Sequence, residues 1–178
     1  MKKISHEKIK KRKPSVEKIK KAKRTEIYAL LDNVRSLHNV GAIFRTSDGV
    51  LLKKLYLCGI TGCPPRKEIA KTALGAEEIV PWEYSDDAVT VIKKLKKKGV
   101  SIVAVELAHD AISYEKAEYE FPVCFILGHE VEGISDEVMD LVDTSIIVPM
   151  LGRANSLNVA TCYGIIVYDA LRKIKFKK

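Results

Sequence analysis

The sequence predicts an α/β fold in which a parallel sheet carries helices on both of its faces. From residue 27 onward, short apolar runs alternate with longer amphipathic stretches, and this order is typical of parallel strands joined by helices. The length of 178 residues suits one domain of ordinary size and is short for two. An uneven charge separates a basic N-terminal extension, residues 1–24, from the domain expected over residues 25–178.

Each expected element follows from its hydrophobic pattern. The apolar runs predict strands over residues 27–31, 55–58, 78–82, 101–106, 123–127 and 145–148. The helical patterns predict helices over residues 40–50, 86–98 and 136–142, and a last helix over about 159–174. Ligands of open parallel sheets bind at the carboxyl ends of the strands, so function is expected at that edge.

The charge of the chain is concentrated at its two ends. The net charge is +8, and residues 1–24 alone, with twelve Lys or Arg against two Glu, carry +10. Residues 172–178 add five basic groups and no acid, which leaves about −7 for residues 25–171. Such ends fit a polyanion such as nucleic acid, although charge alone equally fits solubilising tails. The N-terminal arm is expected to form one or two short basic helices, interrupted at Pro14, or to remain flexible.

Composition also limits the cellular setting and the cofactors. The chain shows no secretory signal and no apolar stretch of the roughly 20 residues that span a membrane, so we expect a cytoplasmic protein with no membrane partner. Its four cysteines lack a paired C-x-x-C spacing. Reduced core thiols and no structural metal are therefore expected.

Several common catalytic motifs are missing. Neither G-x-G-x-x-G after the first strand nor a P-loop occurs, which argues against a conventional nucleotide site. The pair His129-Glu130 lacks the second histidine of H-E-x-x-H, because Gly133 occupies that position. No serine lies in G-x-S-x-G. The remaining polar residues orient and polarise, which suits transfer of a group from an activated donor.

Three polar, glycine-containing motifs follow expected strands. They read L-D-N-V-R-S-L-H-N-V-G-A-I-F-R-T-S-D at residues 31–48, F-I-L-G-H-E-V-E-G-I-S at 125–135 and V-P-M-L-G-R-A-N-S-L-N-V-A at 148–160. On these motifs the chain resembles the SpoU (TrmH-type) RNA 2'-O-methyltransferases of the SPOUT superfamily. The resemblance covers roughly residues 29–174, and all three motifs occur in the family's order.

The resemblance has implications for fold, cofactor and assembly that the hydrophobic pattern does not disclose. It implies that the C-terminal part of the sheet forms a deep trefoil knot, although knots are rare, and that the protein is a homodimer. It implies S-adenosylmethionine as cofactor, with a loop around Leu107 closing over the adenine. The resemblance further places the cofactor among backbone groups near Leu127, Gly128, Val148, Met150 and Leu157.

The resemblance also implies a catalytic group. Arg45 matches the family's catalytic arginine, held near Asn39, Glu130, Ser156 and Asn158. As a base it would need a strongly depressed pKa, because a guanidinium normally keeps its proton; stabilising the alkoxide as it forms is physically easier. Taken singly, these residues have ordinary readings: Arg45 as a surface ion-pairing group, Glu130 and Asn158 as helix caps. No metal is required for this chemistry.

The predicted function is that of an RNA (ribose-2'-O-)-methyltransferase that acts on structured RNA, with tRNA favoured over rRNA as the substrate. One alternative is an RNA-binding protein that kept the SPOUT fold and lost catalysis, but a pure binder has no need of all five polar residues. A small-molecule methyltransferase is a third possibility, which the basic ends disfavour.

Overall fold

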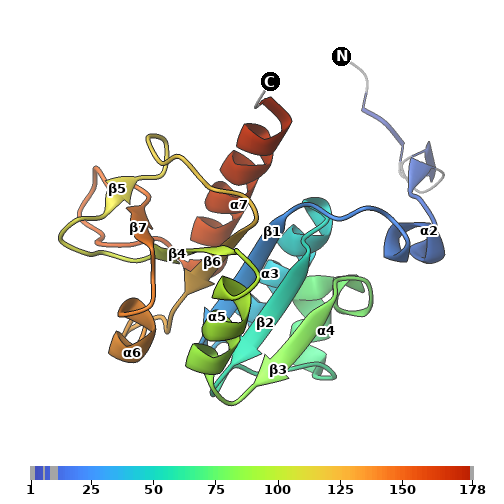
Figure 1. Cartoon of the computed structure of the whole chain (residues 1–178). Coiled ribbons are helices and arrows are strands. Elements are labelled where there is room, and N and C mark those ends of the chain that lie inside the picture. The colour runs from blue at the N-terminus through green and yellow to red at the C-terminus, as the bar shows by residue number, and fades with distance from the viewer. Residues whose placement is uncertain (1–2, 6, 9–11, 177–178) are drawn as a thin grey trace.

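Within residues 3–5, 7–8 and 12–176, which the computed structural model describes, seven strands form one sheet in the order β3-β2-β1-β6-β4-β7-β5 (Figure 1). All neighbouring strands run parallel. The strands are β1 (Ile27–Asp32), β2 (Lys54–Cys58), β3 (Trp82–Ser85), β4 (Ser101–Val105), β5 (Ile112–Ser113), β6 (Val123–Leu127) and β7 (Thr144–Ile147).

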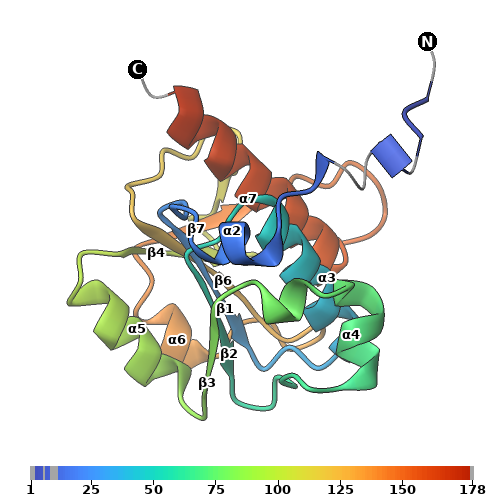
Figure 2. The ribbon, with the colours of Figure 1, turned by 90° about the vertical axis from the view of Figure 1, so that its right-hand side faces the viewer.

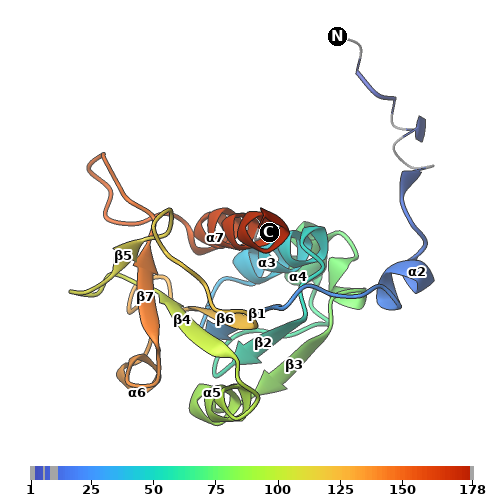
Figure 3. The same cartoon turned by 45° about the horizontal axis from the view of Figure 1, so that its top comes forward.

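Helices cover both faces of the sheet (Figure 3). On one face lie α3 (Leu37–Gly49), α4 (Lys67–Ala73) and α7 (Val159–Phe176), and α3 packs against both of the others. On the other face lie α5 (Ala88–Lys96) and the short α6 (Asp136–Met139), which contact each other. The predicted α/β class, with a parallel sheet and helices on both faces, is confirmed.

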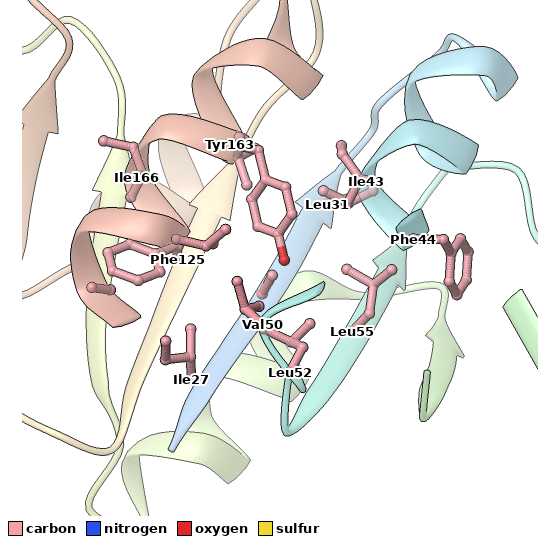
Figure 4. Close-up of a cluster of buried hydrophobic side chains, with 14 of the residues drawn as sticks. Ile27, Leu31, Ile43, Phe44, Val50, Leu52, Leu55, Phe125, Tyr163 and Ile166 are labelled. Carbon is pink, nitrogen blue, oxygen red and sulfur yellow. The ribbon is translucent and has the colours of Figure 1, made fainter. Parts of the chain in front are cut away.

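A hydrophobic core fills the space on each side of the sheet. Leu31 and Phe125 belong to the cluster under α3 and α7 (Figure 4), whereas Leu30 and Ile126 belong to the cluster under α5. Adjacent residues of β1 and β6 are therefore fully buried on opposite faces. This explains why both strands read as continuous apolar runs rather than as alternating patterns.

Tyr163 of α7 is part of this core (Figure 4). Its ring is fully buried, and its hydroxyl lies 2.7 Å from Ser47 Oγ of α3. The hydrogen bond satisfies two polar atoms that would otherwise be buried without partners. Tyr168, one and a half turns later on α7, is 52% exposed.

Two small residues determine where helix α3 begins and how closely it packs against α4. Ser36 caps it by accepting a hydrogen bond from the Asn39 N–H. Gly41 lies one turn inside, where a Cβ atom would overlap Thr72 Oγ1 and the Ile69 carbonyl oxygen of α4. Gly41 therefore permits the close crossing of α3 and α4 and is not a turn glycine.

The predicted strand over residues 78–82 is wrong. Residues Ala76–Glu78 form a 3₁₀ turn, η1, and the strand β3 begins only at Trp82. Leu74 and Gly75 both have positive φ, which ends α4 and redirects the chain into η1. Val80, whose N–H bonds the Ala76 carbonyl, is buried as part of this turn, so its apolar signal comes from helical packing. Helix α4 and strand β5 were not predicted.

The described part of the N-terminal arm contains the helix α2 (Val16–Lys20), capped by Ser15 and without buried residues. Arg24 joins the end of the arm to the body, because its guanidinium donates to the carbonyl oxygens of Leu52 at 3.2 Å and Ile79 at 2.9 Å. The remainder of the predicted helical arm falls partly on residues 1–2, 6 and 9–11, outside the described residues.

A buried carboxylate fixes the end of α7 against the segment between β5 and β6. Asp169, 8% exposed, pairs with Arg172 at 2.7 Å and Lys173 at 2.6 Å and accepts from the Tyr119 hydroxyl at 3.2 Å. Lys173 also donates to the carbonyl oxygens of Tyr114 and Ala117. These contacts give the buried charges the partners that burial requires.

The parallel order gives the sheet two distinct edges. The chain enters β1 from the N-terminal arm at the amino edge, and α7 ends near that same edge (Figures 1 and 2). The carboxyl ends of the strands lie at the opposite edge, where α7 begins. Arg24, at the end of the arm, and Arg172 therefore lie away from the strand ends that bind ligands in such sheets.

Candidate active site

A cavity of about 610 Å³ lies at the carboxyl ends of β4, β6 and β7. Its walls are residues 105–107, 127–133, 146–148 and 155–159, together with Cys162. The cavity lies at the edge of the sheet where the sequence analysis expects the site. Of the predicted site residues, the lining includes Leu107, Leu127, Gly128, Glu130, Val148, Ser156, Leu157 and Asn158, and it does not include Asn39, Arg45 or Met150.

Glu130 ties the second motif to the first. Its carboxylate accepts hydrogen bonds of 3.0 Å from the backbone N–H groups of Arg35 and Ser36 and from the Asn39 side-chain amide. Burial alone would raise the pKa of Glu130, but the hydrogen bonds from Arg35, Asn39 and Ser36 outweigh it and hold the pKa below its usual value. Glu130 is therefore an ionised anchor at the start of α3, where a negative charge is favourable.

Asn39 and Asn158 tie the first motif to the third. The Asn158 amide donates to Asn39 Oδ1 at 3.0 Å, and Asn158 Oδ1 accepts from the N–H groups of Ala160 and Thr161. Asn158 thus caps α7, as its ordinary reading suggested, and it also reaches the site. The result is a chain of hydrogen bonds, Glu130–Asn39–Asn158, across segments 91 and 119 residues apart.

This chain of hydrogen bonds divides the five polar residues into two groups. Glu130, Asn39 and Asn158 use their polar atoms on one another and on backbone groups, which suits a positioning role. Ser156 and Arg45 are exposed, and within the described part of the chain neither side chain has a hydrogen-bond or ion-pair partner. Their polar groups are available to a bound molecule.

Gly128 and Gly133 shape the loop that follows β6. A Cβ atom at Gly128 would overlap the backbone of Gly133 and Ile134, so this position needs close approach rather than positive φ. Gly133 has φ +75°, as a turn requires. His129 and Gly133 exchange two backbone hydrogen bonds of 2.9 and 3.0 Å, which close the loop.

Two carboxylates that the sequence analysis did not select also hold this loop. Asp32, 2% exposed at the end of β1, accepts from the Ser135 N–H at 3.0 Å and from its hydroxyl at 2.8 Å. Glu106, at the end of β4, accepts from the N–H groups of Leu107 and Ile134. Both follow apolar strands directly, and an acid at such a strand end is the signal that could have identified them.

The cysteines supply no reactive group here. All four are free, and Cys58 and Cys124 are buried. Cys162 lines the cavity, where burial, with a smaller contribution from Glu106, raises its pKa to about 11. A thiol with so high a pKa is almost entirely protonated at neutral pH and is a poor nucleophile. Among the described residues, no group of three or more His, Cys, Asp or Glu could hold a metal ion.

We expect Glu130→Gln to destabilise the fold by about 1 kcal/mol at pH 7, because a neutral amide accepts these hydrogen bonds less strongly than a carboxylate. A depressed pKa stabilises the fold above the unfolded carboxyl pKa, about 4.3, and this contribution is lost as pH falls through the folded value. The difference between wild type and variant should therefore shrink below about pH 4. Urea unfolding from pH 3 to 7 measures it.

Glu132→Gln is the matched control for this prediction. Glu132 belongs to the same loop, and its side chain has no hydrogen bond among the described residues, so the same substitution should change stability little. Equal free energies of unfolding for the two variants at pH 7 would contradict the anchoring role of Glu130.

The cavity has the chemistry that a nucleoside cofactor needs. Its volume lies within the range of ordinary small-molecule sites, roughly 300–1,000 Å³. Leu107, Leu127 and Leu157 provide apolar wall, which suits an adenine ring. Gly128 lets the backbone of Gly133 and Ile134 approach closely and so shapes the cavity wall. These residues fit S-adenosylmethionine, the predicted cofactor.

Comparison with known proteins points to the same family as the three sequence motifs. The model of the SpoU rRNA Methylase family matches residues 26–168. The chain is 31% identical over 165 residues to the tRNA (guanosine(18)-2'-O)-methyltransferase of Aquifex aeolicus (strain VF5), covering 93% of this chain and 78% of that protein. No described helix is both long and apolar enough for a membrane crossing.

Solved structures resemble the chain as closely. The crystal structure of the A. aeolicus TrmH/SpoU tRNA modifying enzyme matches with a TM-score of 0.82 and 32% identity, over 96% of this chain and 85% of that one. The AdoMet-bound rRNA methyltransferase from Sinorhizobium meliloti matches with a TM-score of 0.79 and 29% identity, over 86% of this chain and 59% of that one. The resemblance first drawn from three motifs is confirmed, and the chain belongs to the SpoU (TrmH-type) family of RNA methyltransferases.

Proposed function

We propose that this protein transfers a methyl group from S-adenosylmethionine to a ribose 2'-hydroxyl of structured RNA. The observation that carries the proposal is the hydrogen-bonded chain Glu130–Asn39–Asn158, which joins all three family motifs at a cavity of cofactor size. An RNA-binding protein without catalysis has no need of this arrangement, so the inactive alternative is not favoured.

Transfer RNA is the proposed substrate. The A. aeolicus relative is named for methylation of guanosine 18 of tRNA, and that relative matches along nearly the whole of this chain. Ribosomal RNA is the second candidate, because the S. meliloti structure is that of an rRNA methyltransferase. Both classes are folded RNAs, in keeping with the basic N-terminal arm. A cytoplasmic location is proposed because the relatives act on tRNA or rRNA.

The chemistry asks the protein mainly for positioning and charge. When bound, S-adenosylmethionine supplies a methyl group on a sulfonium whose leaving group is a neutral thioether. Arg45 binds the phosphate beside the target ribose and stabilises the alkoxide as the 2'-hydroxyl loses its proton; a guanidinium that keeps its charge does this better than it would act as a base. Glu130, Asn39 and Asn158 fix the segments that align the hydroxyl.

Ser156 completes the proposed polar site. It lies in the cavity wall between the apolar Leu157 and the exposed loop of the third motif. Its hydroxyl can donate to the substrate ribose or accept from it. Met150 lies two residues after the cavity wall residue Val148, and we propose that its backbone contributes when the cofactor is bound.

The knot and the dimer belong to the same proposal. Glu130 accepts a hydrogen bond from the Arg35 N–H and Asp32 accepts one from the Ser135 N–H, so the loop after β6 and the loop after β1 lie together where the knot is proposed. A homodimer would bring Arg45, exposed on α3 and outside the cavity wall of its own subunit, to the partner's cofactor. The half-exposed Tyr168 of α7 suits such a contact.

Transfer of labelled methyl from S-adenosylmethionine to a complete RNA pool tests the proposed function. We expect incorporation by the wild type, and sequencing-based mapping of ribose methylation should place it at one position of one RNA class. Absence of incorporation across the whole pool, with RNA binding intact, would favour the inactive RNA-binding protein. Methylation of small molecules in the absence of RNA would favour a small-molecule methyltransferase.

Deletion of residues 1–24 should weaken RNA binding and reduce its dependence on salt. Basic side chains that neutralise phosphates release counterions, so the logarithm of affinity falls with the logarithm of salt concentration, with a slope of about −0.9 per neutralised phosphate on duplexes. Filter binding between 50 and 300 mM salt measures the slope. An unchanged slope after deletion would assign the arm to solubility instead.

A further inference from the structure

In the loop after β6, the N–H groups of His129 and Gly133 bond each other's carbonyl oxygens, and the other N–H groups from Glu130 to Ser135 bond side chains. The Glu130 N–H bonds its own carboxylate, and the Ile134 and Ser135 N–H groups bond Glu106 and Asp32. The two groups at the tip, those of Val131 and Glu132, both donate to Nδ1 of His129 at 3.2 Å. The shape of this cavity wall therefore depends on four acceptor side chains.

His129 differs from the other three acceptors in its chemistry. Nδ1 receives two N–H donors, so it carries no proton and the ring N–H lies on Nε2. The others are carboxylates, which in their ionised form accept hydrogen bonds and donate none. An imidazole can take up a proton near neutral pH. A proton on Nδ1 would turn this nitrogen from an acceptor into a donor, so it could no longer accept the hydrogen bonds from the Val131 and Glu132 N–H groups.

We propose that His129 is a positioning residue that holds the loop 130–133 in its cofactor-binding shape only while its ring is neutral. Protonation releases the tip of the loop and weakens cofactor binding, so the affinity for the cofactor falls as the pH falls below neutrality. The inference rests on the proposed function for the identity of the ligand. The geometry of the loop stands independently of that function.

Charged and titratable side chains line the same cavity as His129. Its own loop contributes Glu130 and Glu132, the segment after β4 contributes Glu106, and α7 contributes Cys162. The thiol stays neutral across the relevant range, because its pKa lies at about 11. The three carboxylates place negative charge in the cavity wall that His129 shares.

His129→Asn separates the acceptor from the titration. The Asn side-chain oxygen stands two bonds from Cβ, as Nδ1 does, and accepts backbone N–H groups without taking a proton in this range. His129→Ala removes the acceptor at every pH. His109→Asn is the matched control, since His109 is exposed and its side chain has no hydrogen bond among the described residues.

Calorimetric titration with S-adenosylhomocysteine, the demethylated product, at pH 5.5, 6.5, 7.5 and 8.5 is the first measurement. From pH 7.5 to 5.5 we expect the wild type and His109→Asn to lose roughly tenfold in affinity, as two lost neutral hydrogen bonds imply. His129→Asn should keep, at all four pH values, an affinity close to that of the wild type at pH 7.5. A pH-dependent loss in His129→Asn equal to that of the wild type would overturn the proposal.

Amide hydrogen exchange of the ligand-free protein is the second measurement. After correction for intrinsic rates, the Val131 and Glu132 amides should lose protection at pH 5.5 in the wild type but not in His129→Asn. Equal protection at both pH values in the wild type would overturn the proposal even if the cofactor binds. Failure of S-adenosylhomocysteine to bind any variant, with the exchange pattern as expected, would instead count against the proposed function.

Discussion

Arg45→Ala is expected to lower the rate of methyl transfer to RNA at least about a hundredfold, the usual effect of removing one group that stabilises a developing oxyanion. The side chain is exposed on α3 and has no partner among the described residues, so its removal costs the fold little. Arg45 does not line the cavity, and affinity for S-adenosylhomocysteine should stay unchanged. Single-turnover transfer of labelled methyl measures the rate.

Lys97→Ala is the matched control for Arg45→Ala. Lys97 ends α5 on the opposite face of the sheet, is exposed and carries the same charge. Its loss should leave the rate within about twofold and affect RNA affinity only through general electrostatics. A rate for Arg45→Ala equal to that of Lys97→Ala would remove Arg45 from the proposed chemistry. Arg45→Lys should recover part of the rate, because an ammonium keeps the charge but not the bidentate geometry.

Gly128→Ala is expected to disrupt the cofactor cavity and to destabilise the fold by about 3 kcal/mol, at the upper end of overpacking effects. The added Cβ would overlap the Gly133 carbonyl group and the Ile134 nitrogen. These are backbone atoms and have no side-chain freedom with which to move aside. The loop must shift, which breaks the His129–Gly133 hydrogen bonds and the bond from Ile134 to Glu106.

Thermal and urea unfolding, together with S-adenosylhomocysteine titration, measure both effects of Gly128→Ala. Gly164→Ala is the control, because it makes the same substitution inside α7 where a Cβ meets no atom within 4 Å. In a helix this change should stabilise by about 0.5–1 kcal/mol. Wild-type stability and affinity in Gly128→Ala would show that the close approach at this loop is dispensable.

The sequence predicted those parts of the fold whose hydrophobic signal arises from the sheet itself. Strands β1 and β6 are buried on both faces, so they appear as unbroken apolar runs. The misplaced strand over residues 78–82 has an equally apolar stretch, but Val80 is buried by a turn that follows two positive φ angles. Strand β5 has two residues, too few for a periodic pattern.

The site was predictable only as far as the motifs reached. Asn39, Glu130 and Asn158 were selected as a set, and their mutual hydrogen bonds confirm that they meet. The sequence gives no sign that Asp32 accepts from Ser135, because 103 residues separate them and either could serve a surface loop. The role of His129 as an acceptor was missed for a related reason: it depends on a ring orientation that the sequence does not specify.

The position of Arg24 and of the end of α7 at the amino edge has a consequence for the size of a productive substrate. Helix α7 spans 18 residues, about 27 Å at 1.5 Å per residue, and the cavity lies where it starts. Within one subunit, an RNA that touches both Arg172 near the end of α7 and the reacting ribose must bridge most of that span. A minimal hairpin carrying the right nucleotide would then be a far poorer methyl acceptor than the intact RNA, because it is too short to contact the distant basic groups that position the RNA.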